Sequence, residues 1–308
     1  MKVIRHLENF SSSKKSVVTI GSFDGVHLGH QSIINKLKDI ANKENLTPFV
    51  IFFEPLPKEF FLKNTAPARI YSFRDKVINI KETGIENIIC LKFDKKIINI
   101  EAEDFIKEFL VKKLKIDHII IGDDFKFGKD RKGDYDMLLK YSKKFNFTVD
   151  KLSTLNIENK RVSSSLIRNA LLQHDLNKAQ TLLGHNFKIN GRVIHGQKNG
   201  RKLGFHTANL KLPKNSALKG VFLTKIYIDN EVYFGVTNAG VRPTLDGKNF
   251  LLETHIFNFN KEIYKKHITV EILDFIRAEK KFNSFEELKK QINQDIQTAK
   301  KLSFKYTT

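Results

Sequence analysis

The sequence predicts two domains of different class: an α/β doubly wound domain, followed by a small antiparallel β-barrel domain with a C-terminal helix. Three observations predict this order. Across residues 1–184, short and nearly continuous apolar runs alternate with amphipathic helical patterns, which is typical of a parallel sheet covered on both faces. From residue 185 on, strand-length segments follow one another between Gly, Asn-Gly and Asp-Gly turns. The last segment combines a helix-capping signal with one apolar stripe.

Four apolar runs predict the strands of the first domain. Each is too short for a stable helix and rich in Val, Ile or Phe, as expected of buried strands. The runs cover residues 17–20, 48–53, 87–91 and 118–122. Between them, helical spacing of apolar residues predicts helices over residues 31–43 and 103–114. The second helix is expected to bury a face made of Phe105, Ile106, Phe109 and Leu110.

Five further segments predict the barrel. Several alternate apolar and polar residues, and turn residues separate them. They cover residues 187–194, 220–228, 232–237, 251–257 and 268–275. In the closing helix, Ser284 and Glu287 have the spacing of a capping box. Its apolar stripe consists of Phe285, Leu288, Ile292, Ile296 and Ala299. We place the domain boundary near Gly184, which gives domains 1–184 and 185–308.

Composition narrows the class of protein. With 308 residues, of which 41% are hydrophobic, the chain can bury two cores, and global disorder is excluded. The single cysteine, Cys90, excludes a disulfide framework and a thiolate zinc site and fits a reducing compartment. No apolar run approaches the roughly 18–20 residues that a membrane helix needs, and the first residues do not resemble a secretory signal. We therefore expect a soluble, cytoplasmic protein with no membrane association.

The net charge of +20 invites a nucleic-acid interpretation, but its distribution favours another. Only 10 of the 54 basic residues are Arg, the side chain best suited to base readout and bidentate phosphate contacts. The excess is also spread out, with 32 basic and 23 acidic residues over 1–184 and 22 and 11 over 185–308. A dedicated nucleic-acid binder concentrates its charge on one face or arm. A solvated basic surface that tolerates anionic substrates is the favoured interpretation.

A glycine- and histidine-rich segment, residues 21–30, follows the first predicted strand of the α/β domain and precedes its first predicted helix. In a doubly wound sheet, anionic ligands dock at this turn, at the positive end of the helix. The glycines allow close backbone approach, and His27 and His30 supply donors for phosphate oxygens. In this position the His-x-Gly-His pattern indicates nucleotidyl transfer. Two loop histidines without a catalytic role are the alternative.

Two more segments of the first domain could face an anionic ligand. Residues 122–134 follow the fourth predicted strand and combine acidic, basic and aromatic side chains, although taken alone they are typical of an ordinary charged loop. The second, Val162 to Arg168, joins a serine-rich helix start to a guanidinium, which suits a triphosphate. An ordinary helix cap with a surface Arg explains that segment nearly as well.

Together these segments closely resemble the bacterial bifunctional riboflavin kinase/FMN adenylyltransferase family, also called FAD synthetases. The resemblance covers essentially the whole chain and includes residues 53–61, where Leu56 stands in place of the family's usual His. It implies that residues 1–184 form an FMN adenylyltransferase domain of nucleotidyltransferase fold and that residues 185–308 form a riboflavin kinase domain.

In the first domain, the resemblance implies that the FMN phosphate attacks the α-phosphorus of ATP and that pyrophosphate leaves. His27 and His30 would be catalytic and stabilise the α-phosphate, and the serines and Arg168 would hold the pyrophosphate. The implied ATP-binding residues are Gly21, Phe23, Asp24, Gly25, His27, His30, Ser163, Ser164 and Arg168. The implied FMN-binding residues are Asp124, Phe125 and Phe127.

In the second domain, residues 191–209 resemble the kinase nucleotide loop, with His206 where the family usually has Pro. Glu253 matches the family's catalytic carboxylate, which accepts the proton of the ribityl hydroxyl. Thr207 and Asn209 are the implied Mg²⁺ ligands. The implied ATP-binding residues are Gly196, Gly200, Lys202, Gly204, Thr207 and Asn209. Arg277 and Glu279 are the implied flavin contacts, and an ion pair between them is the alternative.

The sequence therefore predicts an enzyme that converts riboflavin and ATP to FMN, and then FMN and ATP to FAD and pyrophosphate. Mg²⁺ is expected with ATP, and FMN and FAD as substrate and products. We expect no nucleic-acid partner and a monomer or weak homo-oligomer. One alternative is an adenylyltransferase whose kinase is weakened or lost, because of His206. Others are a basic nucleic-acid-binding protein on a nucleotidyltransferase-like fold, and a flavin-sensing regulator without catalysis.

Overall fold

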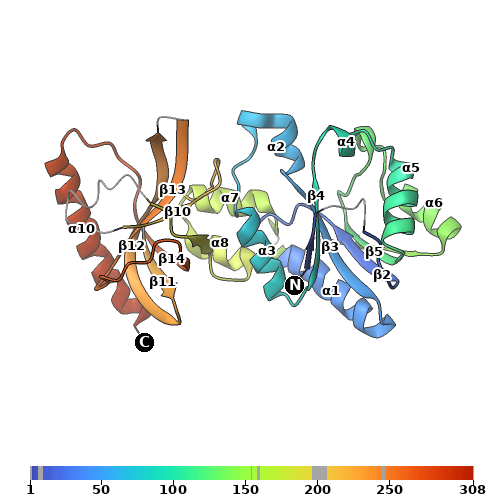
Figure 1. Cartoon of the computed structure of the whole chain (residues 1–308), viewed down its shortest axis with the longest axis horizontal. Coiled ribbons are helices and arrows are strands. Elements are labelled where there is room, and N and C mark those ends of the chain that lie inside the picture. Colours follow the sequence, from blue (N-terminus) through green and yellow to red (C-terminus); the bar gives the residue numbers. More distant parts are fainter. Residues whose placement is uncertain are drawn as a thin grey trace. The chain divides into compact units, whose positions relative to one another are not determined.

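The computed structural model describes residues 2–5, 10–153, 155–157, 160–195, 207–244 and 247–307, with the backbone alone at 242–244 and 247–249 (Figure 1). The chain divides into two compact units. The first consists of Met1–Pro67 and Lys76–Ser163, and the second of Ala68–Asp75 and Ser164–Thr308.

The first unit is built on a six-stranded sheet in the order β1-β4-β3-β2-β5-β6, in which every neighbouring pair is parallel. The strands are β1 (Lys2–Ile4), β2 (Ser16–Ile20), β3 (Thr47–Glu54), β4 (Asn87–Lys92), β5 (Ile116–Gly122) and β6 (Thr148–Leu152). The four predicted strands are confirmed as the centre of this sheet. Edge strands β1 and β6 were not predicted, because they are short and, in β6, largely polar.

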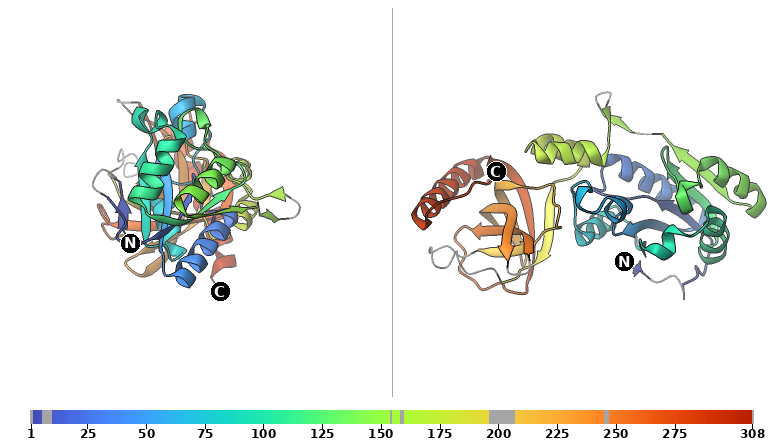
Figure 2. Two further views of the ribbon diagram at one scale, coloured as in Figure 1. Left: turned by 90° about the vertical axis from the view of Figure 1, so that its right-hand side faces the viewer. Right: turned by 90° about the horizontal axis from the view of Figure 1, so that it is seen from above.

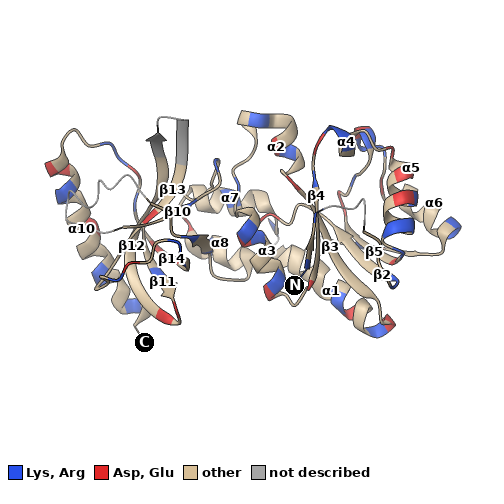
Figure 3. Cartoon of the chain, viewed as in Figure 1, with Lys and Arg blue, Asp and Glu red and all other residues tan. Residues whose placement is uncertain are grey.

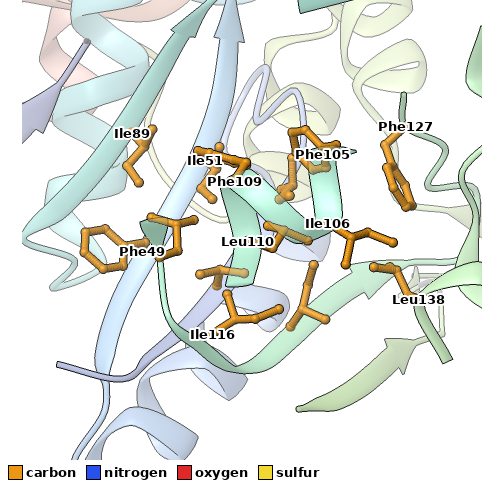
Figure 4. Close-up of a cluster of buried hydrophobic side chains, with 14 of the residues drawn as sticks. Phe49, Ile51, Ile89, Phe105, Ile106, Phe109, Leu110, Ile116, Phe127 and Leu138 are labelled. Carbon is orange, nitrogen blue, oxygen red and sulfur yellow. The ribbon is translucent and has the colours of Figure 1, made fainter. Parts of the chain in front are cut away.

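Both faces of the sheet are buried, as near-continuous apolar strands require. One face carries a hydrophobic cluster in which Phe49, Ile51 and Ile89 of the sheet pack against Phe105 and Leu110 (Figure 4). The alternate side chains along β3, including Val50 and Phe52, are also fully buried, so the opposite face is covered too. Helix α1 (Leu28–Glu44) contributes Ile34, Leu37 and Ala41 as its buried residues. The doubly wound prediction is confirmed (Figure 2).

The predicted helix over residues 103–114 buries the expected face, but its winding differs from an ordinary α-helix. A short helix α5 (Ala102–Asp104) continues as the π-helix η2 (Phe105–Lys113). Leu114 donates its N–H to the carbonyl of Phe109, five residues back. Phe105, Ile106, Phe109 and Leu110 are all buried.

The remaining elements of the first unit connect the strands of the sheet or follow the last of them. They are α2 (Pro57–Leu62), η1 (Lys63–Thr65), α3 (Phe73–Glu82), α4 (Lys95–Ile98), η3 (Lys129–Arg131), α6 (Tyr135–Phe145) and the small hairpin β7 (Asn156–Ile157) with β8 (Lys160–Arg161). Helix α3 begins in the second unit and continues into the first.

The second unit contains a six-stranded antiparallel sheet in the order β10-β13-β12-β11-β14-β9. Its strands are β9 (Lys188–Arg192), β10 (Ala208–Lys211), β11 (Gly220–Ile228), β12 (Glu231–Thr244), β13 (Gly247–Ile256) and β14 (His267–Arg277). A bridge between Ile194 and Asn209 links the two edges, so the sheet curls into the predicted barrel. On one of its faces the hydroxyls of Thr224, Thr237 and Thr254 form a fully buried chain, at 2.8 and 2.9 Å.

Helix α10 (Phe285–Ser303) covers the other face of this sheet, where Ala299 packs with Val221 and Leu223. The predicted cap is present in a shifted form. The Ser284 hydroxyl accepts the N–H of Glu287 at 3.1 Å, while the Glu287 carboxylate accepts the N–H of Asn283. A short helix η4 (Phe304–Tyr306) follows α10.

Helices α7 (Ser164–Leu172) and α8 (Leu176–Leu183) belong to the second unit by their contacts. The His174 ring, between them, stacks on Phe275 of β14 at 3.9 Å. The segment 68–75 joins the same unit because the Asp75 carboxylate accepts the N–H of Asn190 at 2.7 Å. These packing units differ from the functional domains 1–184 and 185–308, which stay a prediction.

Basic and acidic residues are interspersed over the helices and strands of both units (Figure 3). Among the described residues, no helix is both long enough and apolar enough to cross a membrane.

Candidate active sites

The loop between β2 and α1 presents the predicted histidines at a helix start. His27 is the N-cap of α1, where its Nδ1 accepts the N–H of His30 at 3.4 Å. A neutral His27 ring that accepts at Nδ1 carries its proton on Nε2. The N-terminal N–H groups of α1 add a partial positive charge at the same place. A donor and a helix terminus therefore meet there, as binding of a phosphate requires.

The two histidines form a stacked pair. Their ring centroids are 3.7 Å apart, and the ring of Phe23 lies 5.0 Å from that of His30. The Nδ1 atom of His30 is buried and has no hydrogen-bond partner among the described residues. Burial, with smaller contributions from repulsion by the neighbouring His27 ring and the Lys76 ammonium, holds the pKa of His30 well below its usual value. His30 is therefore neutral at pH 7.

A buried cation next to this pair was missed in the sequence. Lys76 on α3 is fully buried, with its Nζ 3.7 Å from the Glu54 carboxylate and 4.7 Å from the centroid of the Phe52 ring. Glu54 ends β3, at the carboxyl edge of the sheet. The only sequence signal was a lysine within a helical pattern, which is typical of a solvated surface.

Close packing at Gly29 fixes the His27 ring. A Cβ on Gly29 would lie 3.3 Å from that ring, and 3.8 Å from the carbonyl oxygen of Val162. The carbonyl of Val162, at the start of the predicted phosphate segment, therefore lies near the histidine loop. Within the loop, Gly25 has a φ of 91° and Asp24 is buried.

The remaining predicted phosphate ligands fall in different units. Ser163 ends a segment of the first unit, and Ser164 and Arg168 belong to the second. Arg168 donates its Nε–H to the carbonyl of Ala68 at 2.6 Å, which fixes the guanidinium within its own unit.

The three residues predicted to contact FMN have different surroundings. Asp124 is exposed, 3.5 Å from the guanidinium of Arg161. Phe127 is buried in the hydrophobic cluster of Figure 4, and Phe125 stacks on it with ring centroids 5.5 Å apart. Phe125 is only partly buried, so its ring is more exposed than that of Phe127. Leu56, where the family usually has His, is buried at the N-cap of α2 and offers no polar side-chain group.

In the second unit, strand register brings several predicted kinase residues into one row. Glu253 of β13 lies directly opposite Asn209 of β10 on one side and opposite Asn238 of β12 on the other. Val221 of β11 is opposite Asn238 and continues the row to Arg277 of β14. Directly opposite residues share a face, and Val221 packs toward α10, so the row lies on the α10 face. We call these five residues the kinase row.

Asn209 has the features of an oxygen ligand. Its side chain is 3% exposed, and its Oδ1 has no hydrogen-bond partner among the described residues. Its Nδ2 donates to the Thr207 carbonyl at 3.4 Å. A buried oxygen that no donor satisfies fits a hard cation such as Mg²⁺. Gly196, Gly200, Lys202, Gly204 and His206 lie outside the described residues.

The predicted flavin contacts lie at the other end of the kinase row. The Arg277 guanidinium is bidentate with Asp295 of α10, at 2.8 and 2.7 Å, and does not form the alternative pair with Glu279. Glu279 packs over Gly240, where a Cβ would overlap its carboxylate. Only glycine at position 240 allows this approach.

A family model described as FAD synthetase matches residues 9–166, and one described as riboflavin kinase matches residues 183–303. The chain is 42% identical to the bifunctional riboflavin kinase/FMN adenylyltransferase of Haemophilus influenzae over 97% of its length and 98% of that protein. It is 39% identical to the protein of the same name from Escherichia coli K12, with 97% of each chain covered.

A solved structure from Streptococcus pneumoniae, named a macrolide-efflux protein, has the same fold along the chain. It matches with a TM-score of 0.77 and 29% identity, and 96% of each chain is covered. The two family models follow one another in the order of the two units, and the curated relatives match from end to end. The chain belongs to the bifunctional riboflavin kinase/FMN adenylyltransferase family.

Proposed function

We propose that this chain makes FAD from riboflavin in two ATP-dependent steps at two sites. The observation that carries the proposal is the separation of the two predicted centres. The stacked His27–His30 pair lies in the parallel-sheet unit, and the kinase row lies on the barrel. Residues 1–184 would form the adenylyltransferase and residues 185–308 the kinase.

At the kinase row, Glu253 accepts the proton of the ribityl 5′-hydroxyl as that oxygen bonds to the γ-phosphorus of ATP. The bond from the γ-phosphorus to the departing ADP oxygen breaks, and FMN is formed. Thr207 and Asn209 would hold Mg²⁺, which neutralises phosphate charge when bound. The unpartnered Oδ1 of Asn209 supports this assignment. Glu279 and Arg277 would lie on the flavin side.

At the histidine loop, an oxygen of the FMN phosphate bonds to the α-phosphorus of ATP, and the bond to pyrophosphate breaks. His27 and His30, with the N–H groups at the start of α1, would stabilise the charge that develops on the α-phosphate. Ser163, Ser164 and Arg168 would bind the pyrophosphate, and Gly21, Phe23, Asp24 and Gly25 would surround ATP. Phe125, with Asp124 and Phe127, would contact the flavin.

The partners we propose are riboflavin, FMN and ATP, with no nucleic acid, for a monomer or weak homo-oligomer. A cytoplasmic location fits two reactions that both consume ATP.

One incubation tests the proposal. Purified protein is mixed with riboflavin, ATP and Mg²⁺, and the three flavins are resolved by chromatography over time. FMN should appear first and then give way to FAD. Glu253→Gln should block the first step alone, and His27→Ala the second alone. No turnover of either flavin would overturn the proposal, and FAD from added FMN alone would leave an adenylyltransferase without its kinase.

A further inference from the structure

The kinase row contains a polar residue to which no role has been given. Asn238 lies directly opposite Glu253 on β12, and residues so paired in antiparallel strands have Cβ atoms about 4.5–5.5 Å apart. Glu253 faces Asn209 on its other side. The carboxylate is therefore flanked by two amides on the same face of the sheet.

Both amides lack a hydrogen bond that their burial requires. The Oδ1 atoms of Asn238 and of Asn209 are inaccessible to solvent and have no partner within the described part of the chain. Nearly all buried polar atoms in proteins are satisfied, because each unsatisfied one destabilises the fold. The neighbour across the strand does not remedy this, since an ionised Glu253 accepts hydrogen bonds and donates none. The missing donor is therefore expected from a ligand.

The order of residues along the kinase row indicates which ligand group meets Asn238. Asn209 is at the nucleotide-loop end, Glu253 is the base, and Arg277 is at the flavin end, with Asn238 between base and flavin end. The reacting groups have the same order: phosphate and cation, then the 5′-hydroxyl, then the other ribityl hydroxyls, then the flavin ring. Asn238 thus falls where a chain of hydroxyl donors passes.

We propose that Asn238 is a further substrate-binding residue of the kinase site, where its Oδ1 accepts a hydrogen bond from a ribityl hydroxyl and orients the chain toward Glu253. The inference rests on the proposed function. It adds a determinant of specificity for a hydroxylated side chain on the flavin.

The test compares Asn238→Ala with the unchanged chain on riboflavin and on analogues that each lack the 2′-, 3′- or 4′-hydroxyl. With riboflavin, kcat/KM should fall roughly three- to tenfold, as expected for one lost hydrogen bond. The loss should disappear with the one analogue that lacks the partner hydroxyl, because the mutation and the deletion then remove the same interaction. Asn260→Ala, which removes an exposed amide after β13, is the matched control and should leave all rates unchanged.

Formation of FAD from added FMN monitors folding in the same samples and should be unaffected. An Asn238→Ala variant with full kcat/KM would overturn the inference, and so would an equal loss with every analogue, which indicates a merely structural role. If the unchanged chain itself does not phosphorylate riboflavin, the proposed function fails instead.

Discussion

The ammonium of Lys76 lies 3.7 Å from the carboxylate of Glu54, and it is fully buried. Such a pair is costly to desolvate and contributes little net stability compared with apolar side chains of the same size. Its position at the carboxyl edge of the sheet, near the histidine pair, indicates a functional reason for keeping it.

We expect Lys76→Met to reduce adenylyl transfer by about tenfold or more, because a positive charge in a dry site stabilises developing phosphate charge. Lys76→Arg should restore part of the rate. The check is FAD formation from FMN at saturating ATP, with riboflavin phosphorylation measured in parallel. Equal loss of both activities would indicate misfolding and would contradict the electrostatic role.

The lowered pKa of His30 predicts how stability depends on pH. The folded chain holds His30 neutral, whereas the unfolded chain binds a proton there as pH falls through about 6.5. Below that pH the unfolded state binds more protons, so the free energy of unfolding should decrease as the solution becomes more acidic, down to the pKa of the folded state. Above pH 7 this contribution should be constant.

Urea unfolding of the unchanged chain and of His30→Gln, measured from pH 7.5 to 5, tests this dependence. The difference in unfolding free energy between the two proteins should change in the acid range and stay flat above neutrality. Parallel curves throughout would show that His30 does not titrate on unfolding.

The Arg277–Asp295 pair predicts a stability effect at the kinase end of the chain. Asp295 is 4% exposed and also accepts a hydrogen bond from Gln291. Removing the guanidinium leaves a buried carboxylate without its cation, so Arg277→Ala should reduce the unfolding free energy by about 3 kcal/mol. Chemical denaturation of Arg277→Ala and of the double variant Arg277→Ala/Asp295→Asn measures it. The double variant should recover part of the loss, and if the single variant is as stable as the parent, the pair has no structural role.

Gly240→Ala should impair the kinase and leave the adenylyltransferase intact. The new methyl group would overlap the Glu279 carboxylate and force it to move. We expect kcat/KM for riboflavin to fall about tenfold, the size of effect that small displacements in an active site produce. Gly235 lies on the same strand but is also tightly packed, so it cannot serve as a control. The control variant is Asn230→Ala, which lies in an exposed turn. A normal riboflavin KM and kcat in Gly240→Ala would contradict a role for Glu279.

The central strands and main helices can be predicted from apolar periodicity. Val50, Ile51 and their neighbours are buried, and this burial does not depend on the conformation of the loops. Short edge strands escape this reasoning. The first two residues of β10 belong to the predicted nucleotide loop, and only its pairing with β13 makes this segment a strand. The sequence does not distinguish the π-helix η2 from an α-helix either, because the same apolar face is buried in both kinds of helix.

The His-x-Gly-His pattern pointed to the histidine pair and the family resemblance pointed to Glu253, but neither found Lys76 or the significance of Asn238. A buried lysine is recognised only when its surroundings are known, since most lysines in helical patterns are exposed. The importance of Asn238 depends on which residue lies across the strand, and register is a property of the folded sheet.

The buried hydroxyl chain of Thr224, Thr237 and Thr254 joins the three neighbouring strands β11, β12 and β13. Sliding β13 by one residue against β12 would break that chain and turn Thr254 outward, while Glu253 would point to the interior of the barrel. The threonines therefore fix the strand register that positions Glu253, although none of them belongs to the proposed kinase site. Substitutions there would misplace the base without altering any residue of the site.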